Sequence, residues 1–102
     1  MSGLLDIDPD HLAQVRALLN ANLPGNVQVM VFGSRARGNA KRFSDLDLAL
    51  KGTSALDLAL LGQLADAFET SALPWRVDLV DYHALTPAFL RAIEADLVTL
   101  PR

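Results

Sequence analysis

The stretch Phe32–Leu50, FGSRARGNAKRFSDLDLAL, decides the fold and carries the candidate chemistry. It contains a Gly-Ser pair, Gly33 and Ser34. After ten intervening residues come two aspartates, Asp45 and Asp47, separated by one leucine. We expect the rest of the chain to form a scaffold that presents these residues, or a surface that receives a partner.

The Gly-Ser pair follows an apolar run, Val27–Phe32, which predicts a buried strand. Gly33 would let the backbone turn sharply and approach a ligand closely. A short helix is expected to begin near Ser34, so free backbone N–H groups and the positive end of the helix dipole would face outward there. Together with the Ser34 hydroxyl, these groups predict a phosphate-binding turn.

The residues Asp45–Leu50 alternate polar and apolar side chains, which predicts a half-buried strand. Because residues i and i+2 share a face, Asp45 and Asp47 would point the same way while the leucines between them enter a core. Two such carboxylates repel each other unless a cation lies between them, and Mg²⁺ suits carboxylates combined with substrate phosphates. This arrangement is typical of phosphoryl or nucleotidyl transfer. The alternative is a plain turn followed by two solvated aspartates.

Three longer helices are expected from apolar residues at helical spacing and from capping residues. The first would run from Asp8-Pro9 to Pro24-Gly25, the second from Ser54, with Asp57 as its capping-box partner, to about Thr70, and the third from Thr86-Pro87.

A third strand is predicted at Arg76–Asp81 and a short edge strand at Val98–Leu100. In the third strand Asp78 would share a face with Arg76, while Asp81 would face the other way and serve as a cap or remain solvated. Helices that alternate with strands predict an α/β layered domain with a small sheet. Periodicity does not give the strand order.

Four cations, Arg35, Arg37, Lys41 and Arg42, follow the Gly-Ser pair within eight residues. They could neutralise a triphosphate or contact an acidic partner. We expect Arg35 and Arg37 to support nucleotide binding, because they lie nearest to Ser34. For the other two, a solvated basic loop is an equal alternative.

Composition limits the class of protein. A chain of 102 residues without cysteine predicts one domain, residues 1–102, with no disulfide framework. The net charge of −3 argues against a general nucleic-acid binder. We find neither a signal peptide nor an apolar run long enough to span a membrane, so a cytoplasmic location is expected. The apolar fraction of 51% indicates either a dense core or a surface that meets a partner.

The motif Gly33–Gly38 followed by Ser44–Leu48 resembles the minimal nucleotidyltransferase (MNT) branch of the DNA polymerase β-like superfamily. The resemblance extends from about Val27 to about Val80. It implies an α/β (α+β) fold with a mixed sheet of three to four strands flanked by helices. It also implies that the Asp45/Asp47 strand lies beside the strand of Asp78, which matches the family's third carboxylate.

The resemblance further implies a mechanism, nucleotidyl transfer with ATP as the donor. Asp45 and Asp47 would hold Mg²⁺, and Gly33 and Ser34 would bind the β- and γ-phosphates. Asp78 would help to hold a second Mg²⁺ and would take the proton of an acceptor hydroxyl.

Only about twenty residues follow Val80, so we expect the acceptor to arrive on another protein. Members of the MNT family act as antitoxins that bind a HEPN-type ribonuclease toxin and adenylylate one of its tyrosines, and the resemblance implies this partner. Two alternatives remain open. The chain could be a non-catalytic module that neutralises its partner by occlusion, or a transferase acting on a small molecule such as an aminoglycoside.

Overall fold

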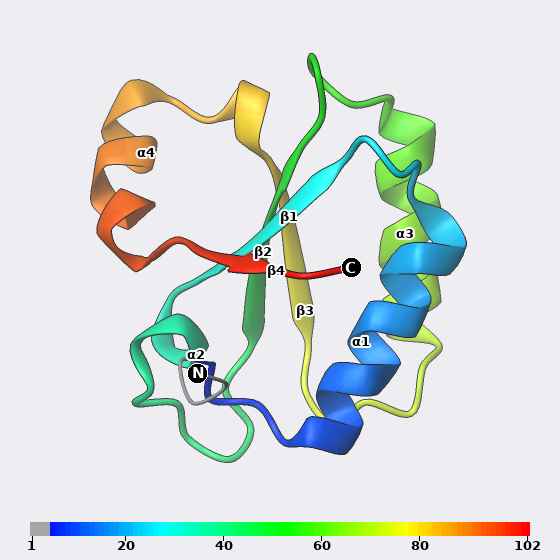
Figure 1. Ribbon diagram of the computed structural model, residues 1–102, viewed down its shortest axis with the longest axis vertical. Helices are drawn as coiled ribbons and strands as arrows, with labels where there is room; N and C mark the ends of the chain where they lie inside the picture. Colours follow the sequence, from blue (N-terminus) through cyan, green and yellow to red (C-terminus); the bar gives the residue numbers. More distant parts are fainter. Residues whose placement is uncertain (1–4) are drawn as a thin grey trace.

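Four strands form one mixed sheet with helices on both sides (Figure 1). The computed structural model describes residues 5–102, so the first four residues of the predicted domain lie outside the described residues. In chain order the elements are α1 (Pro9–Asn22), β1 (Gln28–Phe32), α2 (Ser34–Arg37), β2 (Leu46–Lys51), α3 (Leu58–Glu69), β3 (Val77–Asp81), the 3₁₀ turn η2 (Tyr82–Ala84), α4 (Pro87–Ile93), the 3₁₀ turn η3 (Glu94–Asp96) and β4 (Val98–Leu100). The expected α/β fold is confirmed.

The strand order is β3-β2-β1-β4. β1 runs antiparallel to both β2 and β4, whereas β2 and β3 are parallel. The parallel pair is possible because α3 carries the chain back along the sheet between these two strands. Asp47 lies directly opposite Asp78 in this pair. The expected neighbourhood of the two aspartate-bearing strands is therefore confirmed.

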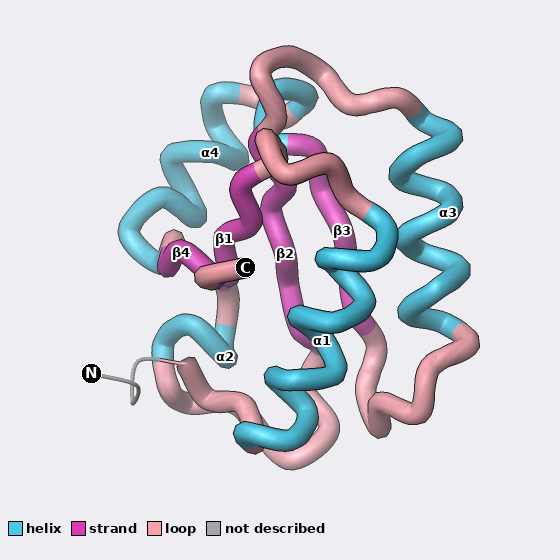
Figure 2. Tube along the Cα trace, turned by 45° about the vertical axis from the view of Figure 1, so that its right-hand side comes forward, coloured by secondary structure: helices cyan, strands magenta, loops and turns pink. Residues whose placement is uncertain are grey.

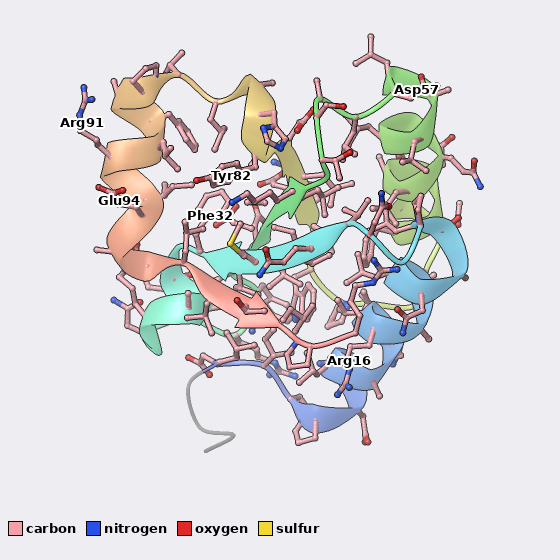
Figure 3. The ribbon with its side chains drawn as sticks, turned by 45° about the horizontal axis from the view of Figure 1, so that its top comes forward. Arg16, Phe32, Asp57, Tyr82, Arg91 and Glu94 are labelled. Atoms are coloured by element: carbon pink, nitrogen blue, oxygen red, sulfur yellow. The ribbon has the colours of Figure 1, made fainter. Side chains whose placement is uncertain are left out.

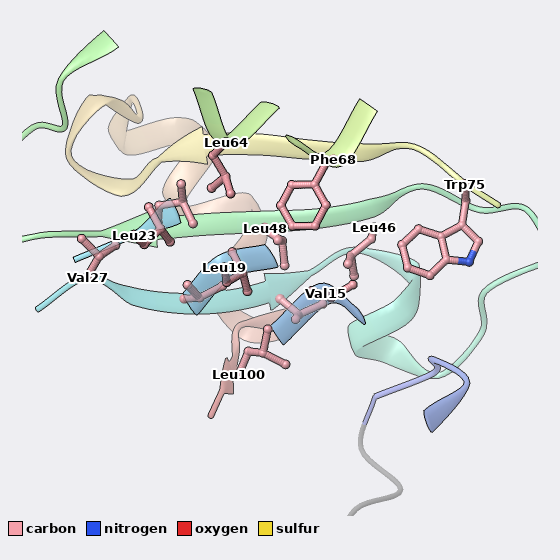
Figure 4. Close-up of a cluster of buried hydrophobic side chains, with 13 residues drawn as sticks. Val15, Leu19, Leu23, Val27, Leu46, Leu48, Leu64, Phe68, Trp75 and Leu100 are labelled. Carbon is pink, nitrogen blue, oxygen red and sulfur yellow. The ribbon is translucent and has the colours of Figure 1, made fainter. Parts of the chain in front are cut away.

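The first face of the sheet carries the larger core, which α1 and α3 cover (Figures 1 and 2). Leu46, Leu48 and Leu50 of β2 are fully buried there. Figure 4 shows the helical side chains that meet them, with Leu19 of α1 and Leu64 of α3 among the labelled residues. The predicted alternation of β2 is thus confirmed on its apolar side.

The second face is covered by α4 over one end only. A smaller cluster joins Met30, Phe32 and Ala49 of the sheet to Ile93 of α4, and Val80 packs against it. Phe32 also meets the ring of Phe89 edge to face, with the ring centroids 6.1 Å apart. Figure 3 shows Phe32 and Tyr82 between the sheet and α4. Asp47 lies two residues before Ala49 on this face of β2, and Asp78 lies two residues before Val80 on β3. Neither aspartate belongs to the apolar cluster.

The helix starts agree with the sequence in two cases and differ in the third. Asp8 caps α1 by accepting a hydrogen bond from the N–H of Asp10 at 2.9 Å, and Thr86 caps α4. The prediction that Ser54 caps α3 is wrong: the helix begins at Leu58, and Asp57 accepts from the N–H of Ala59 at 2.9 Å.

The physical reason lies outside the helix. The N–H of Leu56 donates to Asp81 Oδ2 at 2.7 Å. This bond ties the segment before Asp57 to the end of β3, so the helix forms only after it. Asp81 also accepts a hydrogen bond from the N–H of His83 at 3.0 Å and caps η2, which confirms its expected capping role.

Of the helices in the described part of the chain, none has the length and apolar character needed to cross a membrane.

Candidate active site

The turn after β1 brings the two halves of the sequence motif into contact. Gly33 has φ +78° and ψ −158°, a backbone region that is essentially restricted to glycine. A Cβ atom built on Gly33 would overlap Oδ2 of Asp47. This proximity follows from the sheet, because Phe32 is paired with Asp47 across β1 and β2. Gly33 is therefore required both for the turn and for the space that the Asp47 carboxylate occupies.

A four-residue helix, α2, follows the turn, as predicted. The N–H groups of Ala36 and Arg37 both donate to the carbonyl of Gly33 at 3.1 Å. The helix ends at Gly38, which has a left-handed conformation with φ +79°. Ser34 is thus the first helical residue, where backbone N–H groups lack an intrahelical acceptor.

The three predicted carboxylates lie on one face of the sheet, at the end that α4 leaves open. Asp47 and Asp78 are paired positions of β2 and β3, and Asp45 is two residues before Asp47. Arg76 completes the group. Its Nη2 atom lies 3.6 Å from Oδ2 of Asp45, and its Nε atom lies 3.7 Å from Oδ1 of Asp78.

The electrostatics of Asp47 show that these groups interact. Burial raises the pKa of Asp47, and the negative charges of Asp78 and then Asp45 raise this pKa further. The positive charge of Arg37 opposes the rise. The cluster therefore carries more negative charge than its cationic neighbours neutralise.

A set of hard oxygen donors with surplus negative charge fits a divalent cation such as Mg²⁺. Within residues 5–102, however, no three acidic or histidine side chains are gathered tightly enough to hold a metal ion as they stand. Asp45 and Asp78 are paired with Arg76 instead. Closing a cation site would require these side chains to turn toward Asp47.

Arg37 lies at the edge of this cluster. Its Nη1 atom donates to Oδ2 of Asp96 at 2.8 Å, which ties α2 to η3. Its charge is also the cationic influence on the pKa of Asp47. The structure therefore brings this predicted nucleotide-binding residue close to the carboxylates.

Arg35 has a different environment. It is only 5% exposed, and its guanidinium donates to the carbonyls of Asp6 at 2.7 Å and Ser44 at 2.9 Å. The same group lies 4.6 Å from the centre of the Trp75 ring. Burial lowers the pKa of Arg35, an effect that the charge of Asp6 partly offsets. Arg35 thus holds the loop that ends at Ser44, immediately before Asp45, and its donors are occupied by backbone oxygens.

Sequence reasoning assigned no role to Arg76. The signal was present, because Arg76 is two residues before Asp78 and shares its face. Its position beside Asp45 depends on the strand order. The N–H of Leu46 donates to the carbonyl of Arg76 at 2.9 Å, which aligns the two strands just before their first ladder pair.

The chain is similar to known nucleotidyltransferases in its sequence and to toxin–antitoxin proteins in its structure. Residues 14–100 match the family described as "Polymerase beta, Nucleotidyltransferase". A protein of Haemophilus influenzae, "Probable protein adenylyltransferase MntA", is 41% identical over 96 residues, which cover 94% of this chain and 83% of that protein.

Two solved complexes contain similar chains. A toxin–antitoxin complex with AMP-PNP matches with a TM-score of 0.72 and 28% identity, covering 88% of this chain and 72% of that one. A tri-AMPylated Shewanella oneidensis HEPN toxin in complex with an MNT antitoxin matches with a TM-score of 0.64 and 25% identity, covering 88% and 68%. From the extent of the family match and the identity to the Haemophilus protein, we conclude that this chain belongs to the polymerase beta nucleotidyltransferase family.

Proposed function

We propose that this chain is a Mg²⁺-dependent adenylyltransferase that moves AMP from ATP to a hydroxyl group of a HEPN-type toxin, with a tyrosine as the proposed acceptor. By this transfer it acts as the antitoxin. The observation that carries the proposal is the position of Asp47. Its carboxylate lies against Gly33 of the Gly-Ser turn and in register with Asp78. The Gly-Ser turn, which we propose binds phosphate, and a set of acidic side chains thus meet at one point.

In this proposal Gly33 and Ser34 bind the β- and γ-phosphates of ATP. Asp45, Asp47 and Asp78 hold Mg²⁺, and two ions are expected. When bound, Mg²⁺ offsets the negative charge that develops on the transferring and departing phosphates. Arg37 adds a cation beside the phosphates, and Arg35 acts indirectly by holding the loop before Asp45.

Asp78 accepts the proton of the acceptor hydroxyl. The hydroxyl oxygen then forms a bond to the α-phosphorus, and the bond from this phosphorus to the oxygen that bridges to the β-phosphate breaks. Pyrophosphate leaves and AMP stays on the acceptor. Asp78 suits this role because its side chain is about half exposed, at 45%, at the open end of the sheet, where a protein acceptor has access.

The partner is proposed from the relatives. The Haemophilus protein is named as a protein adenylyltransferase, and both solved complexes pair a toxin with an antitoxin, one of them with an AMPylated toxin. A protein acceptor also agrees with the exposed ring of Phe43, which is 63% accessible and lies two residues before Asp45.

The test uses ATP labelled at the α-phosphate, Mg²⁺, the purified chain and the protein encoded by the adjacent reading frame. Label on that protein, dependent on Mg²⁺ and absent with Asp47→Asn, is the expected result. ATP labelled at the γ-phosphate is the matched control, because AMP transfer leaves that label in pyrophosphate. A tight complex that never becomes labelled would replace the transferase with a module that acts by occlusion.

A further inference from the structure

Arg76 lies among the three carboxylates of the proposed site, yet the reaction described above gives it no task. Its backbone precedes β3, and its side chain shares the face of Asp78. The guanidinium lies between the two strands. It is 3.6 Å from Asp45, the residue just before β2, and 3.7 Å from Asp78 of β3.

The contacts of Arg76 are loose. Both distances are longer than the usual 2.7–3.2 Å of an N–H···O hydrogen bond, so the attraction is mainly Coulombic. The Arg76 side chain is 77% exposed, and those of Asp45 and Asp78 are 42% and 45% exposed. Exposed ion pairs of this kind contribute little to stability. The guanidinium can therefore move aside without disturbing the fold, in contrast to the buried Arg35.

A divalent cation and this guanidinium compete for the same carboxylates. A cation held by Asp45 and Asp78 would lie within a few ångströms of the Arg76 charge and would be repelled by it. We propose that Arg76 is a built-in counter-ion: it neutralises Asp45 and Asp78 until a divalent cation displaces it, and so sets the cation concentration at which the site fills. This inference rests on the proposed metal site.

Asp47 provides the point of entry for the cation. Among the described residues Asp47 forms no ion pair, and its nearby cation Arg37 is engaged by Asp96 at 2.8 Å. A cation that first meets Asp47 would then compete with Arg76 for the carboxylates on either side. The device therefore needs no movement of the backbone, only the rotation of exposed side chains.

The test measures Mn²⁺ binding to the nucleotide-free protein from the electron paramagnetic resonance signal of free Mn²⁺. Arg76→Gln keeps a polar side chain of similar length and removes the charge. Removing one positive charge about 6 Å from a divalent ion, with screening at physiological salt, should tighten Mn²⁺ binding about three- to tenfold. The Mg²⁺ concentration that gives half-maximal AMP transfer should fall by a similar factor.

Arg16→Gln is the matched control, because it changes the net charge equally at an exposed position of α1, on the helix layer of the other face (Figure 3). It should bind Mn²⁺ like the wild type, as should Arg76→Lys, which keeps the charge. The inference is overturned if Arg76→Gln binds Mn²⁺ no more tightly than Arg16→Gln, or if neither binds it.

Asp47→Asn separates this inference from the function on which it rests. If Asp47→Asn abolishes Mn²⁺ binding while Arg76→Gln binds Mn²⁺ with wild-type affinity, the metal site is supported and the counter-ion role of Arg76 is refuted. Failure of the proposed function would instead appear as unlabelled toxin in the transfer assay, whatever the Mn²⁺ affinities.

Discussion

Replacing Gly33 with alanine should damage both stability and AMP transfer. The backbone at φ +78° and ψ −158° lies in a region that costs a non-glycine residue about 1–3 kcal/mol. The new Cβ would also overlap the Asp47 carboxylate, so this side chain must rotate away. For a domain of this size, a loss of about 2 kcal/mol lowers Tm by roughly 8–16 °C. Displacing a reacting group by an ångström costs on the order of a hundredfold in rate.

Two other glycines provide controls. Gly38 also has positive φ, at +79°, but a Cβ there would meet nothing within 4 Å. Gly38→Ala should therefore lose about 1–2 kcal/mol from backbone strain alone and keep its transfer rate. Gly62 lies within α3 with equally open space, so Gly62→Ala should gain about 0.5–1 kcal/mol.

The measurements are thermal unfolding by circular dichroism and the initial rate of AMP transfer at a temperature where all three variants are folded. The contact between Gly33 and Asp47 predicts a rate loss in Gly33→Ala that its stability loss does not explain. If Gly33→Ala and Gly38→Ala transfer AMP at rates within about twofold of each other, the contact has no functional role.

The remaining predictions test the electrostatics and the caps. The pKa of Asp47 is higher in the folded than in the unfolded chain, so ionisation of Asp47 disfavours the folded state. The free energy of unfolding is therefore highest below the pKa that Asp47 has in the unfolded chain, and it falls as pH rises through the pKa that Asp47 has in the folded chain. Asp47→Asn should therefore unfold at a higher temperature than the wild type at pH 7 without divalent cations, and thermal scans should show the advantage vanishing in acid. Arg35→Met should cost about 2–4 kcal/mol in urea unfolding, because partly buried carbonyls lose the charged donors of a buried guanidinium. Arg37→Met, which breaks an exposed pair, should cost about 1 kcal/mol or less, and equal losses would contradict the assigned burial of Arg35. Asp57→Ala should lose about 1 kcal/mol of stability in the same assay, because Asp57 caps α3, and Ser54→Ala should lose almost nothing. A larger loss in Ser54→Ala than in Asp57→Ala would instead support a helix that begins at Ser54.

Local chemistry was sufficient to predict most of the fold from the sequence. Period-two alternation placed Asp45 and Asp47 on one face and placed Asp78 and Asp81 on opposite faces of their strand. The family resemblance then selected Asp78, which the structure pairs with Asp47. Asp8 and Thr86 were recognised as caps because each is followed by proline at the first helical position. Only the neighbourhood of β2 and β3 came from the family resemblance; the full order β3-β2-β1-β4 was not predicted, since periodicity carries no information on which strands pair.

The sequence did not reveal contacts that tertiary structure creates. Ser54 and Asp57 are both good capping residues, and the hydrogen bond from Leu56 to Asp81 decides between them across 25 residues. Arg35 appeared to be one of several cations near a phosphate turn. Only the folded chain shows that it is buried over Trp75, because nothing in its local spacing distinguishes it from Arg37.

The alternation in β2 has an evolutionary consequence. Leu46 and Leu48 occupy the interior while Asp47, between them, serves the chemistry. One codon inserted or deleted at the start of β2 would exchange these two sets, sending carboxylates inward and leucines to the open end of the sheet. Length changes here should therefore be purged by selection even where point substitutions survive.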